Sequence, residues 1–114
     1  MTLSKGEIRL ANLNPAKRSN EMGKVRPVLV YQNNELNTAG YPTTIVIPFS
    51  SVLIDDAEPI RMRVGKREKL LQDSDLVLTQ IRAIDNERFS EKLGSLTKDE
   101  LEKVKVLLGE VLGE

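Results

Sequence analysis

The chain has 114 residues, of which 39% are hydrophobic and 30% are charged, and its formal net charge is zero. This length and composition predict one globular domain, residues 1–114, with its own apolar core. The chain contains no cysteine and no histidine, which excludes disulfides, thiol nucleophiles, serine–histidine triads and histidine acid–base pairs. A zinc site would need carboxylates alone, which is unusual, so we expect no metal and no cofactor.

The N-terminal half contains three predicted strands. Residues 6–13 alternate between polar and apolar and predict a half-buried strand. Residues 16–24 are polar without periodicity, which predicts a long loop. Residues 25–31 and 43–49 are nearly continuous apolar runs rich in β-branched side chains, typical of buried strands. Between them, residues 33–39 favour a single helical turn.

The middle of the chain predicts further short strands. Residues 60–64 alternate, with two arginines on the solvent face. Residues 76–81 are expected to form another strand, and residues 92–94 are expected to return as an edge strand. Between these two segments, Asp85 is expected to cap a short turn over residues 86–89.

The C-terminal segment predicts a helix. Thr97 and Glu100 have the spacing of a capping box, in which each side chain accepts a hydrogen bond from the other residue's backbone N–H. The apolar residues that follow recur at helical spacing and form one stripe: Leu101, Val104, Leu107, Leu108, Val111 and Leu112. Several short strands sealed by a helix predict a mainly β fold with α, a small β-barrel decorated by short helices and a C-terminal helix. No segment has the length and apolarity of a membrane span, and the N-terminus lacks an apolar signal core, so a cytoplasmic protein is expected.

The zero net charge conceals two basic blocks. Residues 1–34 hold six basic side chains against two acidic ones, and residues 61–71 hold five against one. If the two blocks share a face, they could bind a polyanion such as nucleic acid. The alternative is that both belong to solvated loops.

The polar residues at the ends of the two buried strands are candidates for phosphate chemistry. Arg26 enters the first strand, and its guanidinium could bind a phosphate or form a structural pair with Glu7 or Glu21. Ser50 and Ser51 follow the second strand, where a hydroxyl could bond a phosphoryl oxygen or cap a turn.

Two further positions could supply polar groups. Glu21 is either a general base or the partner of Arg26. Gln80 and Arg82 could donate to a base edge or to a phosphate.

Six motifs occur in a fixed order along the chain. They are Gly6-Glu7-Ile8, Leu13-Asn14-Pro15, residues 21–30, Gln32-Asn33-Asn34, residues 45–51 and residues 78–85. Together they closely resemble the MazF/PemK family of toxins from bacterial toxin–antitoxin pairs, over residues 5–108.

The resemblance implies an SH3-like barrel that forms two-fold dimers. It also implies a metal-independent, sequence-specific endoribonuclease acting on single-stranded RNA, chiefly mRNA, and inhibited by a cognate MazE-like antitoxin protein. The family's arginine and hydroxyl at the scissile phosphate match Arg26 and Ser50, and Glu21 is the candidate for assisting deprotonation. The predicted RNA-binding residues are Asn14, Lys17, Arg18, Lys24, Ser51, Gln80 and Arg82.

Two departures from the family pattern affect what the resemblance implies. The loop after Pro15 is one residue longer than usual, with Arg18 where glycine is common, so substrate preference is not transferred. Thr79 stands where the PemK branch carries a catalytic acid, which favours the arginine–hydroxyl arrangement.

Two other functions remain open from the sequence. One is a protein-binding module such as a CcdB-type gyrase poison on the same barrel. Only 4% of residues are aromatic, which leaves few platforms for base stacking and fits that function. The other is a family member that lacks catalysis and acts only as a partner or scaffold.

Overall fold

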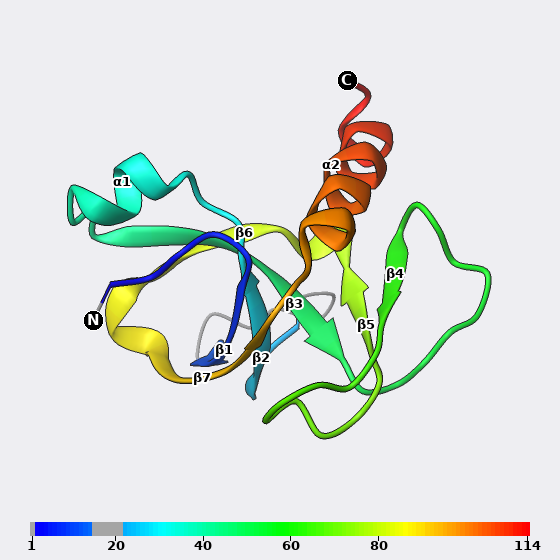
Figure 1. Cartoon of the computed structure of the whole chain (residues 1–114), viewed down its shortest axis with the longest axis horizontal. Helices are drawn as coiled ribbons and strands as arrows, with labels where there is room; N and C mark the ends of the chain where they lie inside the picture. Colours follow the sequence, from blue (N-terminus) through cyan, green and yellow to red (C-terminus); the bar gives the residue numbers. More distant parts are fainter. Residues whose placement is uncertain (1, 15–21) are drawn as a thin grey trace.

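The computed structural model describes residues 2–14 and 22–114. In chain order its elements are β1 (Glu7–Asn12), β2 (Val25–Val30), α1 (Asn34–Thr38), β3 (Thr43–Ser50), β4 (Arg61–Val64), β5 (Ser74–Val77), β6 (Arg82–Asp85), β7 (Phe89–Ser95) and α2 (Lys98–Leu112), with 3₁₀ turns at Leu78–Gln80 and Asn86–Arg88. The strands form an antiparallel sheet in the order β4-β5-β3-β2-β1-β7, and β6 pairs with β3 (Figure 1).

The long strand β3 organises the sheet because it pairs with three others. β2 lies along one edge, while the other edge pairs first with β6 and then, at Ser50 and Asp75, with β5. The single strand predicted over residues 76–81 is therefore wrong. The 3₁₀ turn Leu78–Gln80 separates β5 from β6. Both strands pair with β3, β5 at the end of β3 and β6 at its beginning.

The strand ladder has two ends, β4 and β7. The segment after β4 reaches β7 through one backbone hydrogen bond, from Lys69 N–H to the Leu93 carbonyl at 2.9 Å. The sheet thus curves toward closure without forming a continuous ladder. The predicted fold class, mainly β with a C-terminal helix, is confirmed, and the barrel is not closed.

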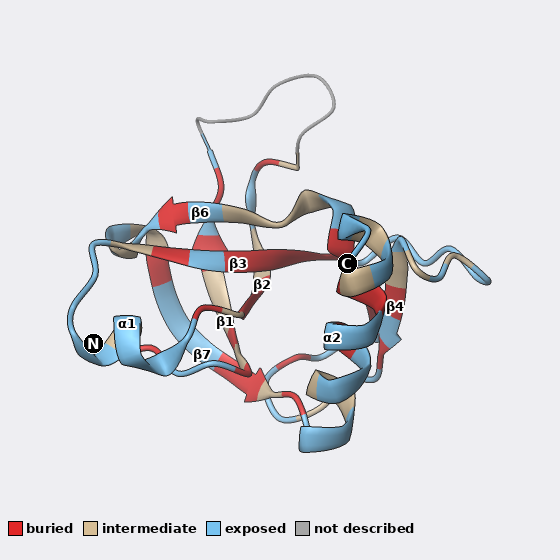
Figure 2. Ribbon diagram, turned by 90° about the horizontal axis from the view of Figure 1, so that it is seen from above, coloured by how far each residue is buried: buried red, intermediate tan, exposed pale blue. Residues whose placement is uncertain are grey.

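Apolar side chains are buried on both faces of β3 and of the second half of β2, and Figure 2 shows β3 as largely buried. On β2, Val28 and Val30 belong to one core cluster and Leu29 to the other. On β3, Val46 and Ile47 divide between the two clusters in the same way. Because successive side chains of a strand point to opposite faces, burial on both faces requires an unbroken apolar run. This explains the two continuous runs in the sequence.

Helix α2 packs on the larger of the two clusters and begins with the predicted capping box. Glu100 N–H donates to Thr97 Oγ1 at 3.1 Å, and Thr97 N–H donates to Glu100 Oε1 at 2.8 Å. The predicted apolar stripe is buried at its centre, whereas Leu112 is 54% exposed. Neither this helix nor any other in residues 2–14 and 22–114 has the length and apolarity needed to cross a membrane.

Candidate active site

A cavity of about 630 Å³ lies where β2 begins and β3 ends. Four residues singled out from the sequence line it: Lys24, Arg26, Ser50 and Ser51. These residues meet because β2 and β3 are antiparallel neighbours, so the entry of one strand adjoins the exit of the other. The rest of the wall comes from the segment between β4 and β5 and from β7.

Two backbone carbonyls hold the Arg26 guanidinium in this cavity. Its Nε donates to the Gly23 carbonyl at 2.7 Å, and its Nη1 donates to the Phe49 carbonyl at 3.2 Å. No carboxylate in residues 2–14 or 22–114 forms an ion pair with it; the predicted alternative partner Glu7 pairs with Arg9 and Lys92 instead. Partial burial lowers the pKa of Arg26. A guanidinium that has lost water without gaining a counter-charge favours an anionic ligand.

The two serines differ in their surroundings. Ser50 is only 8% exposed, and its hydroxyl forms a local turn with Val52: Val52 N–H donates to Ser50 Oγ at 3.2 Å, and Ser50 Oγ donates to the Val52 carbonyl at 3.4 Å. The turn-capping role considered from the sequence is therefore present at Ser50. Ser51 is exposed on the cavity wall.

Positive charge is in excess among the described residues that line the cavity. Lys69 and Glu91 pair across the wall at 3.7 Å, which leaves Lys24 and Arg26 as the charges in excess. Lys24 has a left-handed φ of 68°, a conformation that costs a non-glycine residue roughly 1 kcal/mol. Hydrogen bonds fix it there, since its N–H donates to Asn14 Oδ1 at 2.9 Å and its carbonyl accepts from Leu13 N–H at 2.9 Å.

Three other predicted RNA-binding residues, Asn14, Gln80 and Arg82, do not line this cavity. Gln80 Oε1 accepts from Met22 N–H at 3.3 Å, and Arg82 Nη1 donates to the Met22 carbonyl at 3.2 Å. Together with Asn14, these side chains hold the backbone that leads into β2. Lys17, Arg18 and Glu21 lie outside the residues that the structure describes.

The sequence did not single out the far wall of the cavity. It comprises residues of the β4–β5 segment and of β7, among them Lys69, Gln72 and Glu91. These residues reach the site only through tertiary contacts between distant segments. The one sequence signal for them was the second basic block, which contains Lys69.

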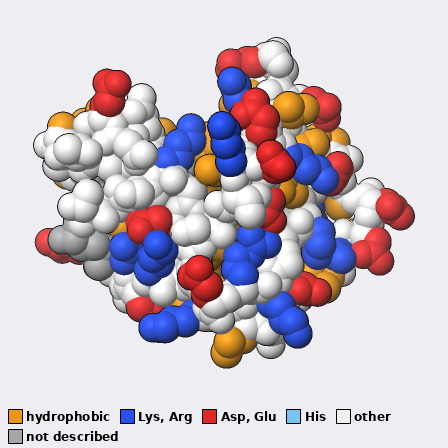
Figure 3. All heavy atoms as spheres, in the orientation of Figure 1, with side chains coloured by type: hydrophobic (Ala, Val, Ile, Leu, Met, Phe, Trp, Pro, Cys, Tyr) orange, Lys and Arg blue, Asp and Glu red, His pale blue; other side chains and the backbone are white. Residues whose placement is uncertain are grey.

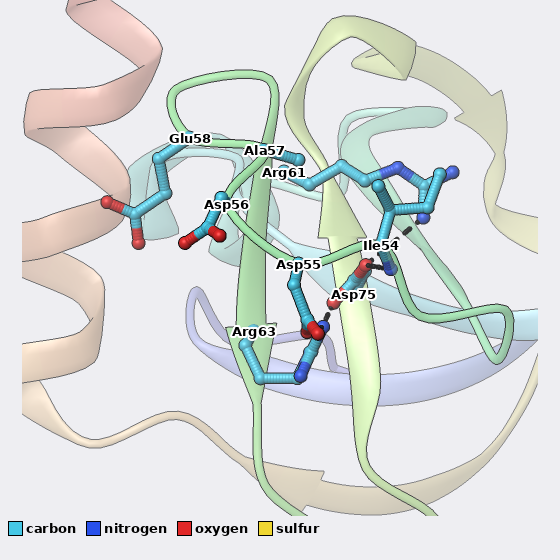
Figure 4. Close-up of a pocket in the computed structure, with 8 residues that line it drawn as sticks. All are labelled: Ile54, Asp55, Asp56, Ala57, Glu58, Arg61, Arg63 and Asp75. Carbon is cyan, nitrogen blue, oxygen red and sulfur yellow. Dashed lines mark hydrogen bonds and ion pairs between the residues drawn. The ribbon is translucent and has the colours of Figure 1, made fainter.

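The second basic block is largely neutralised within the protein. A second cavity, of about 700 Å³, contains Asp75, whose carboxylate accepts from Arg63 Nε at 2.6 Å, Ile54 N–H at 2.8 Å and Arg61 Nη1 at 3.2 Å (Figure 4). Burial opposes ionisation of Asp75, yet these hydrogen bonds outweigh it and hold its pKa below the ordinary value.

Two further ion pairs add to the neutralisation of this block. Arg63 also pairs with Asp55 at 2.8 Å, and Arg67 pairs with Glu100. Figure 3 shows the same mixture at the surface, where basic and acidic side chains alternate on the visible face. No three carboxylates in the described parts of the chain are arranged to hold a metal ion. Among the described residues, the second basic block therefore adds little unpaired positive charge for binding a polyanion.

Comparison with known proteins connects this geometry to a family. A family model described as the PemK-like, MazF-like toxin of type II toxin–antitoxin systems matches residues 4–112. Among solved structures, the chain is similar to MazF from Deinococcus radiodurans, with 23% identity, a TM-score of 0.80, and coverage of 100% of this chain and 99% of that one.

Two other solved structures have the same fold. An endoribonuclease from Mycobacterial species shares 16% identity with a TM-score of 0.76, and the match covers 99% of this chain and 93% of that one. A MazE–MazF structure from Deinococcus radiodurans shares 22% identity with a TM-score of 0.76, covering 99% of this chain and 97% of that one. At these identities the likeness is one of fold.

Proposed function

Because the chain belongs to the PemK-like, MazF-like family of toxins of type II toxin–antitoxin systems, we propose that it is an endoribonuclease that cleaves single-stranded RNA without a metal ion. The observation that carries the proposal is Arg26, whose guanidinium lies in a cavity beside Ser50 with no carboxylate pairing it in the described residues. A phosphodiester anion bound in this cavity would neutralise the charge of the guanidinium. One of the structurally similar proteins is an endoribonuclease.

The proposed reaction uses the nucleophile that RNA carries itself. The 2′-oxygen attacks the adjacent phosphorus, the bond from phosphorus to the 5′-oxygen breaks, and the products are a 2′,3′-cyclic phosphate and a 5′-hydroxyl. The 2′-hydroxyl proton passes to a base, for which Glu21 remains the predicted candidate, and the leaving 5′-oxygen gains a proton. The protein must hold the attack in line and stabilise the charge on the crowded phosphorus.

The two central residues have distinct roles in this proposal. Arg26 donates its free N–H groups to the non-bridging phosphoryl oxygens as their charge increases. Its two bonds to backbone carbonyls hold the guanidinium in position before RNA binds, so less conformational entropy is lost on binding. The Ser50 hydroxyl donates a hydrogen bond to the same phosphate. Lys24 and Ser51 bind the RNA backbone on either side of that phosphate.

We propose the same partners as the resemblance implies. MazE–MazF structures are among those similar to this chain, and a MazE-like antitoxin is the proposed inhibitor. The active form is proposed to be a homodimer in the cytoplasm, with residues 1–114 as its single toxin domain.

The test is cleavage of a mixed-sequence single-stranded RNA by the purified protein in EDTA. Cleavage is expected, with 2′,3′-cyclic phosphate ends that resist a 3′-adenylating enzyme and 5′-hydroxyl ends that a polynucleotide kinase labels directly. Absence of cleavage, or cleavage only after magnesium is added, would contradict the proposal. Inhibition of DNA supercoiling that survives Arg26→Ala, without RNA cleavage, would indicate gyrase poisoning instead.

A further inference from the structure

The Val52 carbonyl, two residues beyond Ser50, accepts hydrogen bonds from two donors. Ser50 Oγ donates to it at 3.4 Å, and Arg61 Nη1 donates to it at 3.0 Å. The first is long for a hydroxyl donor and therefore weak, whereas the second is charge-assisted and of normal length. Val52 also lines the candidate active site. Arg61 thus reaches the active-site wall from the second cavity.

Asp75 holds Arg61 in this position. Its carboxylate is 1% exposed and accepts from Arg61 Nη1 at 3.2 Å, and the Arg61 side chain is itself only 19% exposed. Asp75 pairs with Ser50 across the β3–β5 ladder, and it also accepts from Ile54 N–H. Figure 4 shows Arg61, Ile54 and Asp75 converging. The loop after Ser50 is therefore tied to the strand that faces Ser50.

The arrangement determines what the Ser50 hydroxyl is able to do. A serine hydroxyl has a single proton to donate. Turning that proton to a phosphate would break the bond from Ser50 Oγ to the Val52 carbonyl, which is already weak at 3.4 Å. The charge-assisted bond from Arg61 Nη1 keeps the carbonyl paired when this happens, so the Ser50 hydroxyl is not needed there. Meanwhile Val52 N–H, donating to Ser50 Oγ at 3.2 Å, keeps the oxygen in place.

We propose that Arg61, held by Asp75, is a positioning residue of the ribonuclease site: it satisfies the Val52 carbonyl and so releases the Ser50 hydroxyl to donate to the scissile phosphate. The inference rests on the proposed function. Arg61 itself touches no RNA in this scheme, because its Nη1 is bound to Asp75 and Val52 and its charge is paired with the Asp75 carboxylate. Its effect on the reaction passes entirely through Ser50.

A double-mutant cycle tests this route. The single-turnover rate and the KM for one single-stranded RNA are measured in EDTA for the wild type, Arg61→Met, Ser50→Ala and the double variant. Ser50→Ala is expected to slow cleavage about 100-fold, as for loss of one donor to a developing oxyanion. Arg61→Met is expected to slow it about tenfold in the wild-type background but less than about twofold in the Ser50→Ala background. The KM of Arg61→Met should stay close to that of the wild type, since Arg61 makes no contact with RNA.

Arg63→Met is the matched control. Arg63 also binds Asp75 and belongs to the same strand, but its other partner is Asp55 rather than Val52. Its cleavage rate is expected to stay within about twofold of the wild type. Thermal melts report whether each variant is folded. If Arg61→Met does not fold, Arg61→Gln goes through the same cycle with the same expected loss of additivity.

The outcomes separate this inference from the function on which it rests. Equal losses from Arg61→Met in both backgrounds, or a loss in Arg63→Met as large as in Arg61→Met, would overturn the positioning role while leaving the ribonuclease intact. A wild-type protein that cleaves no RNA would overturn the proposed function, and this inference with it. A loss at Arg61 that vanishes without the Ser50 hydroxyl would support both.

Discussion

One arginine, Arg26, lies on one side of the end of β3, and a pair, Arg61 and Arg63, lies on the other, and their surroundings differ. Arg26 binds the carbonyl oxygens of Gly23 and Phe49, whereas Arg61 and Arg63 share the buried carboxylate of Asp75. Carbonyl dipoles hold a guanidinium in place without cancelling its charge, and a carboxylate cancels it. The contrast teaches that local counter-charge, and not the number of basic residues, decides where an anion could bind.

The largest expected effect compares one arginine from each side of β3. Arg26→Ala should reduce the RNA cleavage rate by about 1,000-fold, because it removes the donor aimed at the phosphate. Arg63→Ala should keep the rate within about threefold of the wild type, since that charge is already neutralised. Initial rates on a labelled RNA in EDTA measure both. Similar losses in the two variants would abolish the distinction between the two sides.

For protein stability, the larger effect is expected on the side of the carboxylate cluster, at Asp75, and the smaller one at Arg26. Asp75→Ala should lower the free energy of unfolding by about 3 kcal/mol, because it leaves partly buried arginine charge and the Ile54 N–H without their acceptor. Arg26→Ala should lower it by about 1 kcal/mol, as its two bonds are to carbonyl groups. Urea denaturation gives both values. A greater loss of stability in Arg26→Ala than in Asp75→Ala would show that the cavity, and not the carboxylate cluster, holds this end of the sheet.

Acid should weaken the carboxylate cluster selectively. The pKa of Asp75 is lower in the folded protein than its ordinary value of 3.8, so its ionised form contributes stability above that value. This contribution is lost as the pH falls through the folded-state pKa. The stability difference between wild type and Asp75→Asn is therefore expected to be largest at neutral pH and to shrink below pH 3.8. Urea midpoints from pH 7 to pH 2.5 measure it, and a difference independent of pH would contradict the pairing.

The smallest expected effect concerns salt. Lys24 is a cavity charge that no carboxylate among the described residues pairs, whereas Arg67 is bound by Glu100. Binding of a 2′-O-methyl RNA, which lacks the attacking hydroxyl, should lose about 0.7 from its slope of log affinity against log salt in Lys24→Met. Arg67→Met should keep the wild-type slope. Fluorescence anisotropy at several salt concentrations gives the slopes, and equal reductions in both variants would count against a localised site.

The sequence predicted the elements that depend on neighbouring residues. The continuous apolar runs in β2 and β3, and the capping box of α2, are local patterns with one structural solution each. The break at Leu78–Gln80 was missed because no glycine or proline marks it between Leu76 and Ile81. Only the pairing of β3 with two successive strands reveals where the chain must turn.

The site was predictable in part for the same reason. Arg26 and Ser50 lie at the ends of strands that the sequence identified, so their meeting follows from antiparallel pairing. The partners of Arg61 and Arg63 were not predictable, because Asp75 reaches them through strand register rather than sequence distance. Counting Arg61 and Arg63 as free positive charges in the sequence therefore overestimated the basic surface.

Met22, just before β2, is held by hydrogen bonds to both of its backbone polar groups. Gln80 and Arg82 bind both backbone groups of this residue, and Arg26 binds the carbonyl of the next one. The start of the strand that carries Arg26 is thus held by two side chains from a distant part of the chain. A substitution at Gln80 or Arg82 is therefore expected to disturb the direction of the Arg26 guanidinium although neither residue lines the cavity.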